Sequence, residues 1–309
     1  MVLVIAVLAP ALSGDAARPA LIADGVTVAG VPVGGMSNEQ AQAALRPAFA
    51  KPVQLVFTTR QWRIVPARFG AKVGLVDGVA SAMNARPGTD VELTPTVDQE
   101  AVRTFVRALD KRISYEAKDA ELAGLDGLQP KLTPEQTGVQ VLRQLTAQRI
   151  TRALQSPQIH RVRVAARVIE PQRTVANFGP VIVIRRGANE LRYYVGAKLV
   201  RTFGVATGQS VYPTPTGTFR IVDMQRDPWW RPPDSPWAQG LKPIPPGPGN
   251  PLGTRWMGLT APGVGIHGTP DDASIGYSAS HGCIRMHIPD AEWLFNHVEL
   301  GTPVVIVDA

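Results

Sequence analysis

The N-terminal part of the chain alternates between hydrophobic positions at helical spacing and short apolar runs. Between residues 99 and 111, hydrophobic side chains recur every three or four positions, which predicts an amphipathic helix. Ser37 and Gln40 have the spacing of a capping box, so we expect a short helix to begin there and to end at Pro47. Residues 141–150 predict a third helix with one apolar side.

Strand patterns lie between these helices. Residues 53–57 and 62–65 are apolar segments on either side of a polar turn, and both are expected to be strands. In residues 161–167, hydrophobic side chains alternate with arginines, which predicts a strand with one buried face. Helices and strands are mixed here without any grouping of catalytic side chains. We therefore predict an α+β domain over residues 23–172.

The pattern becomes mainly β after residue 172. Apolar segments separated by glycines predict successive strands at residues 181–184, 191–195 and 199–205. A short helix is expected from Pro289, and residues 304–307 predict a closing strand. This order predicts a second domain over residues 175–309 with a mainly β fold, a mixed-sheet β-sandwich with one short helix.

Residues 213–270 interrupt the strand pattern. They hold 13 of the 28 prolines and four of the six tryptophans. Because proline has no N–H to donate to a ladder, we predict a long irregular loop here. Its tryptophans either offer a binding surface to a substrate or only pack the loop.

The first twelve residues, MVLVIAVLAPAL, form a continuous apolar run. As a helix they would extend about 18 Å, which is short of the ~30 Å core of a bilayer but suits the apolar part of a signal peptide. No basic residue precedes the run, so we expect residues 1–22 to be the end of an export signal or membrane anchor that starts upstream. A buried strand is the alternative. Export would place the protein outside the cytoplasm, in a cell wall or a periplasm-like space.

Composition narrows the class of protein. The chain has 309 residues, 44% of them hydrophobic, which excludes wholesale disorder and favours two domains. Its single cysteine excludes a disulfide scaffold and a multi-cysteine metal site. The net charge is +7, and residues 1–174 contribute +6 of it, from 21 basic and 15 acidic residues. The basic residues form no run and do not interleave with aromatics, so no nucleic-acid partner is expected, and an anionic wall or membrane surface fits better.

The candidate chemistry lies near the C-terminus. Four of the five histidines follow residue 266, and the only cysteine, Cys283, lies among them in the segment Ser280-His281-Gly282-Cys283. A thiol with an ordinary pKa near ~8.5 is mostly protonated at neutral pH, so a nucleophilic cysteine needs a base. His267 is the stronger candidate for that base, because it lies at the end of an apolar segment and a rigid strand end holds a side chain in place. His281 is nearer to Cys283 in sequence and is the alternative. The other ring nitrogen of His267 needs an acceptor: the Gly268 carbonyl, Asp271 or Asp272.

This ordered set of motifs resembles the catalytic domain of the L,D-transpeptidases (YkuD-like). The resemblance rests on His267, on Ser280-His281-Gly282-Cys283-Ile284-Arg285 and on Thr214-Pro215-Thr216-Gly217-Thr218-Phe219, and it covers about residues 178–309. The segment GVPVGGMSNEQA, which opens the N-terminal domain, resembles the module that precedes peptidoglycan-acting domains in VanW-like wall proteins. That likeness implies a peptidoglycan-binding or spacer domain.

The resemblance implies roles for named residues. Cys283 would be the nucleophile, His267 the general base and acid, and Gly268 the residue whose carbonyl orients His267. His281 and Gly282 would shape the oxyanion region, and residues 225–258 would form a lid over the pocket. The remaining expected substrate-binding residues are Arg285, Ser280, Trp256 and Tyr277.

The implied reaction is acyl transfer on peptidoglycan tetrapeptide stems, with release of D-Ala and formation of 3→3 cross-links. No cofactor and no metal is expected, and carbapenem-type inhibitors should acylate the thiol. An L,D-carboxypeptidase using the same site and a non-catalytic wall-binding scaffold are the alternatives. Arg285 could instead be a structural ion-pair partner.

Overall fold

The computed structural model describes residues 20–309, so the predicted export segment lies almost wholly outside the described residues. Within residues 20–309, no helix has both the length and the apolar character needed to cross a bilayer. The chain divides into two compact units. Residues up to Glu116, together with Val139–Ile169, form the first unit; Ala117–Gly138 and Glu170–Ala309 form the second.

The first unit begins with a small layered core. Its elements are β1 (Thr27–Val28), β2 (Val31–Pro32), α1 (Asn38–Ala50), α2 (Leu75–Met83) and β5 (Asp90–Val91), and its sheet has the order β2-β1-β5. Helix α1 begins with the predicted capping box, in which the Ser37 side chain accepts from the Gln40 N–H and the Gln40 side chain accepts from the Ser37 N–H. The prediction that Pro47 ends the helix was wrong. Leu45 and Phe49, one turn apart, are both buried against this core, and their packing keeps the last turn helical.

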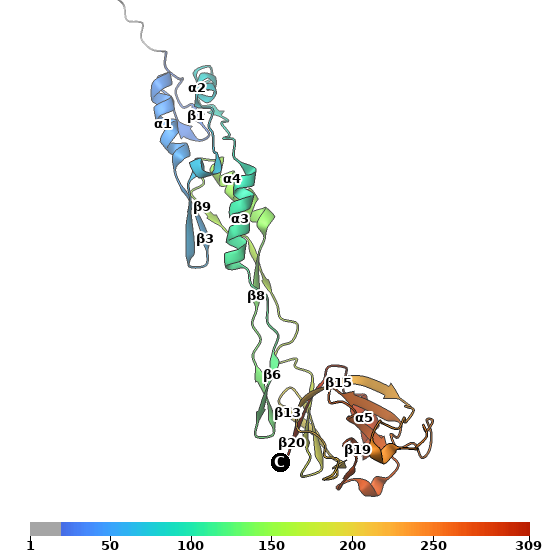
Figure 1. The fold of residues 1–309 in the computed structure, drawn as a ribbon. Coiled ribbons are helices and arrows are strands. Elements are labelled where there is room, and N and C mark those ends of the chain that lie inside the picture. The colour runs from blue at the N-terminus through green and yellow to red at the C-terminus, as the bar shows by residue number, and fades with distance from the viewer. Residues whose placement is uncertain (1–19) are drawn as a thin grey trace, which may run out of the picture. The chain divides into compact units, whose positions relative to one another are not determined.

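A second core in the first unit joins two helices to a small sheet (Figure 1). Its elements are β3 (Val53–Phe57), β4 (Arg60–Ile64), a 3₁₀ turn at Pro66–Phe69, α3 (Gln99–Ile113), β8 (Gly138–Val141), α4 (Arg143–Leu154), β9 (Arg161–Arg163) and β10 (Ala166–Ile169). The sheet order is β4-β3-β9, and β8 pairs with β10. Helix α3 buries the side chains at its predicted apolar spacing, including Val102, Val106 and Leu109. The α+β prediction for this part of the chain is confirmed.

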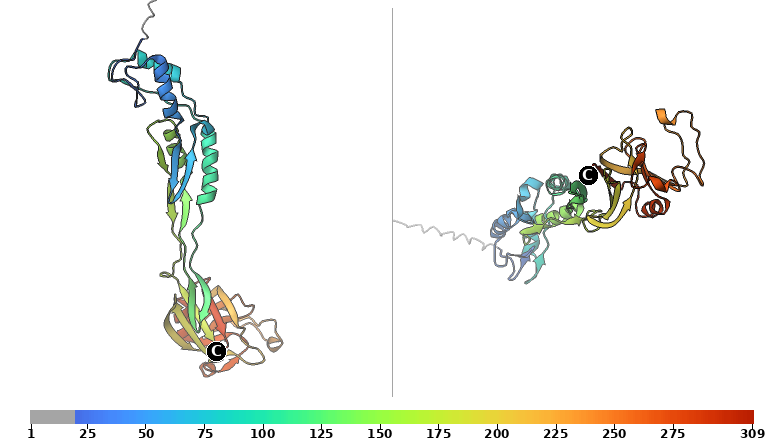
Figure 2. Two further views of the ribbon diagram at one scale, coloured as in Figure 1. Left: turned by 90° about the vertical axis from the view of Figure 1, so that its left-hand side faces the viewer. Right: turned by 90° about the horizontal axis from the view of Figure 1, so that it is seen from below.

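One eight-stranded mixed sheet builds the second unit, in the order β13-β12-β11-β20-β15-β16-β17-β19. Its strands are β11 (Pro180–Arg185), β12 (Glu190–Val195), β13 (Lys198–Gly204), β15 (Gly217–Arg226), β16 (Arg255–Leu259), β17 (Gly265–Thr269), β19 (Ile284–His287) and β20 (Pro303–Val307). A short pair, β14 (Thr207–Gly208) and β18 (Ser278–Ser280), and helix α5 (Ile288–Phe295) are also part of it. The strands of this sheet run in colour from yellow to red in Figure 2. The mainly β prediction with one short helix is confirmed.

Residues 117–138 differ from the predicted domain division, which assigns them to the N-terminal domain. They form the hairpin β6 (Glu121–Asp126) and β7 (Gln129–Thr133), which belongs to the second unit. Strand β11 is buried on both faces: Ile182 and Ile184 enter the main core, while Val181 and Val183 lie in a second cluster with leucines of the hairpin. The hairpin therefore covers apolar surface that the main sheet leaves open.

The prediction of one irregular loop over residues 213–270 was too broad. Strands β15, β16 and β17 lie inside that range. The irregular connection is only residues 227–254, and nine of the range's thirteen prolines lie there, because the ladder strands on either side tolerate none.

Candidate active site

His267 lies in the middle of β17, whose five residues are all buried. In the sheet register it is directly opposite Trp256 of the antiparallel neighbour β16 and Arg285 of the parallel neighbour β19. Residues opposite one another across a sheet project from the same face. The imidazole is therefore held between an indole ring and a guanidinium by strands on both sides.

One hydrogen bond sets the tautomer of His267. Its Nδ1 lies 2.7 Å from the carbonyl oxygen of Gly268, so Nδ1 carries the proton and donates it. Nε2 is then left with the lone pair that a general base needs. Burial lowers the pKa of His267 to about 4, and the nearby Arg285 charge acts in the same direction, while the bond to Gly268 opposes both. The ring is a neutral base at neutral pH.

Cys283 immediately precedes β19, two residues before Arg285 on the same strand face. Its Sγ lies 3.5 Å from the carbonyl oxygen of Gly263. Desolvation raises the pKa of the Cys283 thiol, against smaller opposing effects of a backbone hydrogen bond from Gly265 and the Arg285 charge. The resting group is therefore a thiol, which must lose its proton during the reaction to become a nucleophile.

The turn before Cys283 depends on Gly282, whose φ of +113° is strained for any residue with a side chain. The buried Thr214 hydroxyl donates to the Gly282 carbonyl and accepts from the Gly208 N–H, which ties the TPTGTF motif to this turn. The Gly282 N–H in turn donates to the Ser280 hydroxyl, which itself donates to the Cys283 carbonyl. Ser280 and Gly282 thus use these groups to hold the turn.

A cavity of about 520 Å³ brings the chemistry-bearing residues together. Of the residues predicted from sequence, those that line it are Cys283, His267, His281, Arg285, Ser280 and Trp256. Gly268 and Gly282 act on its walls through their backbone carbonyls. Tyr277 is 68% exposed and is not among the lining residues, so its predicted contact with substrate has no support from this geometry.

The two acidic residues near the site pair with groups other than His267. Asp271 lies 3.7 Å from Arg285, and Asp272 lies 2.6 Å from His287 Nδ1. Of the three acceptors considered for His267, the structure therefore uses the Gly268 carbonyl. Arg285 is mostly buried and still lines the cavity, so the ion pair does not remove it from the site.

Trp256 forms one wall behind His267, with ring centroids 5.9 Å apart in a stacked arrangement. Its indole N–H donates to Asp223, which also accepts from Gln225. The six-membered ring of Trp256 occupies the space over Gly265: a Cβ added there would lie 2.3 Å from an indole carbon. Asp223 and Gly265 therefore hold Trp256, and neither has a distinctive sequence signal.

The irregular connection, residues 227–254, reaches the site through its tryptophans. Trp229, Trp230 and Trp237 line the cavity. Trp237 stacks on His281 at 4.0 Å between ring centroids, and Tyr212 lies against the same imidazole at 5.2 Å. Burial and the Arg285 charge lower the pKa of His281, which favours the neutral ring in this aromatic contact. His281 thus joins the connection to the cysteine turn.

Asn250 organises this connection, and sequence analysis missed it. Its side chain is buried, donates to the carbonyl of Pro228 at 2.9 Å and to those of Ile244 and Pro245, and accepts from the Leu252 N–H. A proline-rich segment has few N–H donors, so its carbonyls need a side-chain donor. A lone asparagine among prolines is the only signal that pointed to this role.

Among residues 20–309, no three His, Cys, Asp or Glu side chains are placed to hold a metal ion. The two other histidines of the C-terminal segment are satisfied locally, His287 by Asp272 and His297 by the Trp293 carbonyl.

Two family models match the chain. Residues 179–306 match the L,D-transpeptidase catalytic domain (YkuD), and residues 56–163 match the family described as "Putative peptidoglycan binding domain". Both resemblances noted from the sequence are confirmed.

Curated relatives match the C-terminal part. The chain is 36% identical over 134 residues to "Putative L,D-transpeptidase YqjB" of Bacillus subtilis, covering 42% of this chain and 72% of that protein. It is 35% identical over 125 residues to "Putative L,D-transpeptidase YkuD" of the same organism, covering 40% of this chain and 64% of that protein. A solved catalytic domain of the E. faecium L,D-transpeptidase acylated by ertapenem is 26% identical, with a TM-score of 0.35, covering 42% of this chain and 98% of that one.

Proposed function

Because the chain belongs to the L,D-transpeptidase family, we propose that it forms 3→3 cross-links in peptidoglycan by cysteine acyl-enzyme chemistry. One observation carries this proposal: Cys283 and His267 line the same cavity, and the Gly268 carbonyl leaves Nε2 of His267 free to take a proton. The donor would be a tetrapeptide stem and the leaving group D-Ala.

In the first step, His267 Nε2 takes the thiol proton while Cys283 Sγ attacks the carbonyl carbon before the terminal D-Ala. The S–C bond forms, the C–N bond breaks, and the proton held by His267 passes to the leaving amine. In the second step, a side-chain amine of a neighbouring stem attacks the thioester and gives its proton to His267. The amide bond forms, and the thiolate leaves and takes that proton back.

The developing oxyanion needs N–H donors. The Gly282 N–H is committed to Ser280, so the proposal assigns the N–H of Cys283 itself to the oxyanion. Arg285, whose charge lies in the cavity wall, would bind a carboxylate of the donor stem.

The balance between transfer and hydrolysis would depend on residues 227–254, the proposed lid. Its three tryptophans line the cavity and so limit access of water to the thioester. If water attacked instead of an amine, the same residues would give an L,D-carboxypeptidase. The substrate is a wall polymer, so the proposed location is outside the cytoplasm, and the apolar N-terminal run fits export or attachment to a membrane.

Incubation with tetrapeptide muropeptides tests the proposal. A 3→3 dimer, absent with Cys283→Ala and with His267→Ala, supports it; tripeptide alone assigns the carboxypeptidase; and no change in either product rejects enzyme activity. Intact-mass spectrometry with a carbapenem gives a second readout. We expect one adduct on the unmodified chain and none on Cys283→Ala, whereas equal adducts on both would reject Cys283 as the nucleophile.

A further inference from the structure

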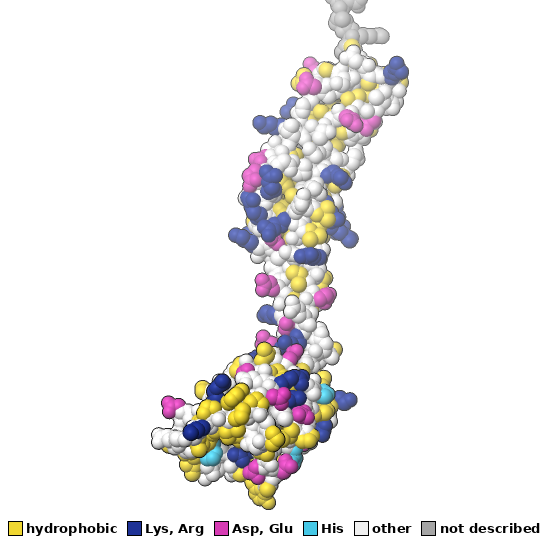
Figure 3. All heavy atoms as spheres, turned by 90° about the vertical axis from the view of Figure 1, so that its right-hand side faces the viewer, with side chains coloured by type: hydrophobic (Ala, Val, Ile, Leu, Met, Phe, Trp, Pro, Cys, Tyr) yellow, Lys and Arg dark blue, Asp and Glu magenta, His cyan; other side chains and the backbone are white. Residues whose placement is uncertain are grey.

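A groove of about 830 Å³ lies between α3 and α4 in the first unit, whereas the chemistry described above belongs to the second unit. Among its described lining residues are four arginines and four glutamines, with no carboxylate and no aromatic ring. The arginines are Arg103 and Arg107 of α3 and Arg143 and Arg152 of α4. Lys and Arg side chains gather on one face of this unit (Figure 3).

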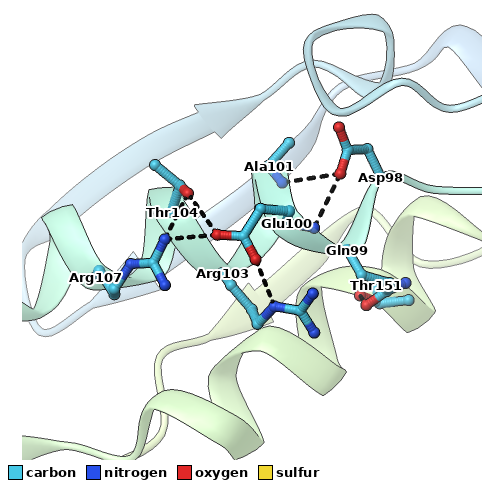
Figure 4. Close-up of polar contacts among 8 residues, drawn as sticks. All are labelled: Asp98, Gln99, Glu100, Ala101, Arg103, Thr104, Arg107 and Thr151. Atoms are coloured by element: carbon cyan, nitrogen blue, oxygen red, sulfur yellow. Dashed lines mark hydrogen bonds and ion pairs between the residues drawn. The ribbon is translucent and has the colours of Figure 1, made fainter.

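Acidic residues beside the groove orient its arginines without cancelling their charge. Glu100 accepts from Arg103 Nε at 3.0 Å and from Arg107 at 2.6 Å, and the Thr104 hydroxyl accepts from Arg107 and donates to Glu100 (Figure 4). These bonds hold the pKa of Glu100 at about 2, so it stays ionised. Only Nε of Arg103 takes part, which leaves both terminal nitrogens of that guanidinium for a ligand.

The second helix is arranged similarly. Arg143 pairs through Nε with Asp110 at 3.1 Å, and Arg152 has no ion-pair partner among residues 20–309. Four cations thus face two carboxylates, Glu100 and Asp110, so the groove keeps a positive excess. It accounts for part of the charge of +6 that the N-terminal residues carry.

Spacing indicates an extended ligand. Arg103 and Arg107 are about 6 Å apart along α3, and Arg143 and Arg152 are about 14 Å apart along α4. A single small anion cannot reach both ends of such a row. At one end, the Thr151 hydroxyl donates to the Gln99 side chain across the helices at 3.2 Å, so the two walls are joined.

The uncharged lining residues indicate the kind of polymer. Arginine forms paired hydrogen bonds with carboxylates, and glutamine amides both donate to and accept from peptide amides and sugar hydroxyls. A glycan strand with short acidic peptides offers all of these groups. Nucleic acid is disfavoured because no aromatic side chain is available to stack on a base.

We propose that the α3–α4 groove binds uncross-linked peptidoglycan through the free carboxylates of its stem peptides. The polymer would be the same one on which the catalytic unit is proposed to act, so its identity rests on the proposed function above. The match of residues 56–163 to a peptidoglycan-binding family covers both helices but assigns no binding residues.

Binding of purified glycan strands to the full chain carrying Cys283→Ala tests the groove. Arg103→Gln/Arg152→Gln removes one arginine from each helix, and Arg46→Gln/Arg86→Gln removes the same charge at exposed positions outside it. We expect the groove variant to weaken binding about 10-fold or more and the control less than 2-fold, since a charge-assisted hydrogen bond carries about this much. Equal weakening in both variants, or none in the groove variant, overturns the proposal.

Two further binding experiments identify the chemical group that the groove recognises. Strands whose stem carboxylates have been converted to amides should bind the Cys283→Ala chain as weakly as intact strands bind the groove variant. Competition by inorganic polyphosphate, with amidated strands still bound normally, would assign the groove to a phosphate polymer and overturn the proposal. Carbapenem acylation of the chain that keeps Cys283 tests the catalytic unit separately. Loss of strand binding alone would therefore count against the groove, and loss of acylation alone would count against the proposed function.

Discussion

The position of His267 in the sheet explains its chemistry at the scale of one residue. Its strand is paired on both sides, and the Gly268 carbonyl accepts a hydrogen bond from the protonated Nδ1, which fixes the orientation of the ring. Burial of the ring makes its protonated form unfavourable. In the resting site, His267 is therefore a neutral base and Cys283 a neutral thiol, and the two do not form an ion pair.

Stability should depend on pH through this histidine. Between its ordinary pKa of 6.5 and the folded value of about 4, the unfolded chain binds a proton at His267 that the folded chain does not. The free energy of unfolding should therefore fall by about 3 kcal/mol as the pH is lowered through this window. Urea unfolding at pH 7 and pH 4.5 measures it. A His267→Gln chain should lose less over the same range, and equal losses would contradict the lowered pKa.

The acid limb of activity should follow the same group. Because His267 stays deprotonated down to about pH 4, the rate of carbapenem acylation should hold through pH 6 and fall only near pH 4. Stopped-flow or quenched mass spectrometry across pH 3.5–7 measures this. A midpoint near the ordinary histidine value of 6.5 would show that the ring is more exposed than the structure indicates.

Gly265 should be intolerant of a methyl group. Alanine at this position would place its Cβ in the ring of Trp256 and displace that ring, which stacks against His267. We expect Gly265→Ala to cost about 1–3 kcal/mol of stability and to slow acylation about 100-fold, because catalytic groups tolerate little displacement. Gly179→Ala, where a Cβ meets open space, is the matched control. Acylation at the control's rate would mean that Trp256 does not position His267.

At the scale of elements, the proposed lid, residues 227–254, is held by hydrogen bonds within the segment, whereas the hairpin is held by contacts with strands distant in sequence. The lid's carbonyls are gathered by one buried amide, Asn250, and Trp230 and Ile244 close it with two backbone hydrogen bonds. The hairpin is held by a bond from the Tyr194 hydroxyl to the Leu128 carbonyl and by burial of its leucines. Neither element has a large hydrophobic core of its own, so each depends on these specific contacts for its conformation.

Removing the Asn250 amide should loosen the lid. Asn250→Ala leaves proline carbonyls without donors, so we expect a loss of about 2 kcal/mol and faster proteolytic cutting within residues 227–254. Product analysis should show a larger share of tripeptide relative to 3→3 dimer, as water gains access to the thioester. Gln239→Ala, an exposed polar change in the same segment, controls for the substitution itself. Unchanged cutting in Asn250→Ala would contradict this account of the lid.

At the scale of the molecule, the second unit is assembled from two separate stretches of chain. Lys118 pairs with Gln136, and the Ala120 N–H donates to the Arg173 carbonyl, so the hairpin and the catalytic strands form one body within this unit. The hairpin buries Phe178, Val181, Val183 and Tyr194. A boundary drawn at residue 175 would divide that cluster.

Truncation tests this assembly. A chain starting at residue 175 should bind a hydrophobic dye and melt several degrees below a chain that keeps residues 117–138 joined by a flexible linker to residues 170–309. The reason is the apolar face of β11 and β12 that the hairpin covers. Calorimetry and dye fluorescence measure both. Equal melting temperatures would show that the hairpin is not needed for the stability of the catalytic unit.

Local patterns were sufficient for the elements whose signals are contained in a few neighbouring residues. The capping box of Ser37, the apolar spacing of α3 and the apolar strand at residues 181–184 were predicted correctly. The continuous apolar run of β11 also indicates that this strand is buried on both faces, because a strand that is apolar at every position needs cover on each side. Leucines of the hairpin supply that cover, but their positions in the sequence do not show which strand they pack against.

The sequence by itself determined the family and the two fold classes, and it predicted Cys283 and His267 as the candidate catalytic pair, because spaced motifs and hydrophobic periodicity are properties of short segments. Only the tertiary structure decided that Gly268 rather than Asp271 or Asp272 orients the base, that Trp237 stacks on His281, and that four arginines from two helices share one groove. The bond to Gly268 joins neighbouring residues, but the paired strands on either side of β17 set the orientation in which the His267 ring meets that carbonyl. The other two features join residues far apart in the chain. Such contacts depend on how whole elements are placed in three dimensions, and no local pattern contains that information.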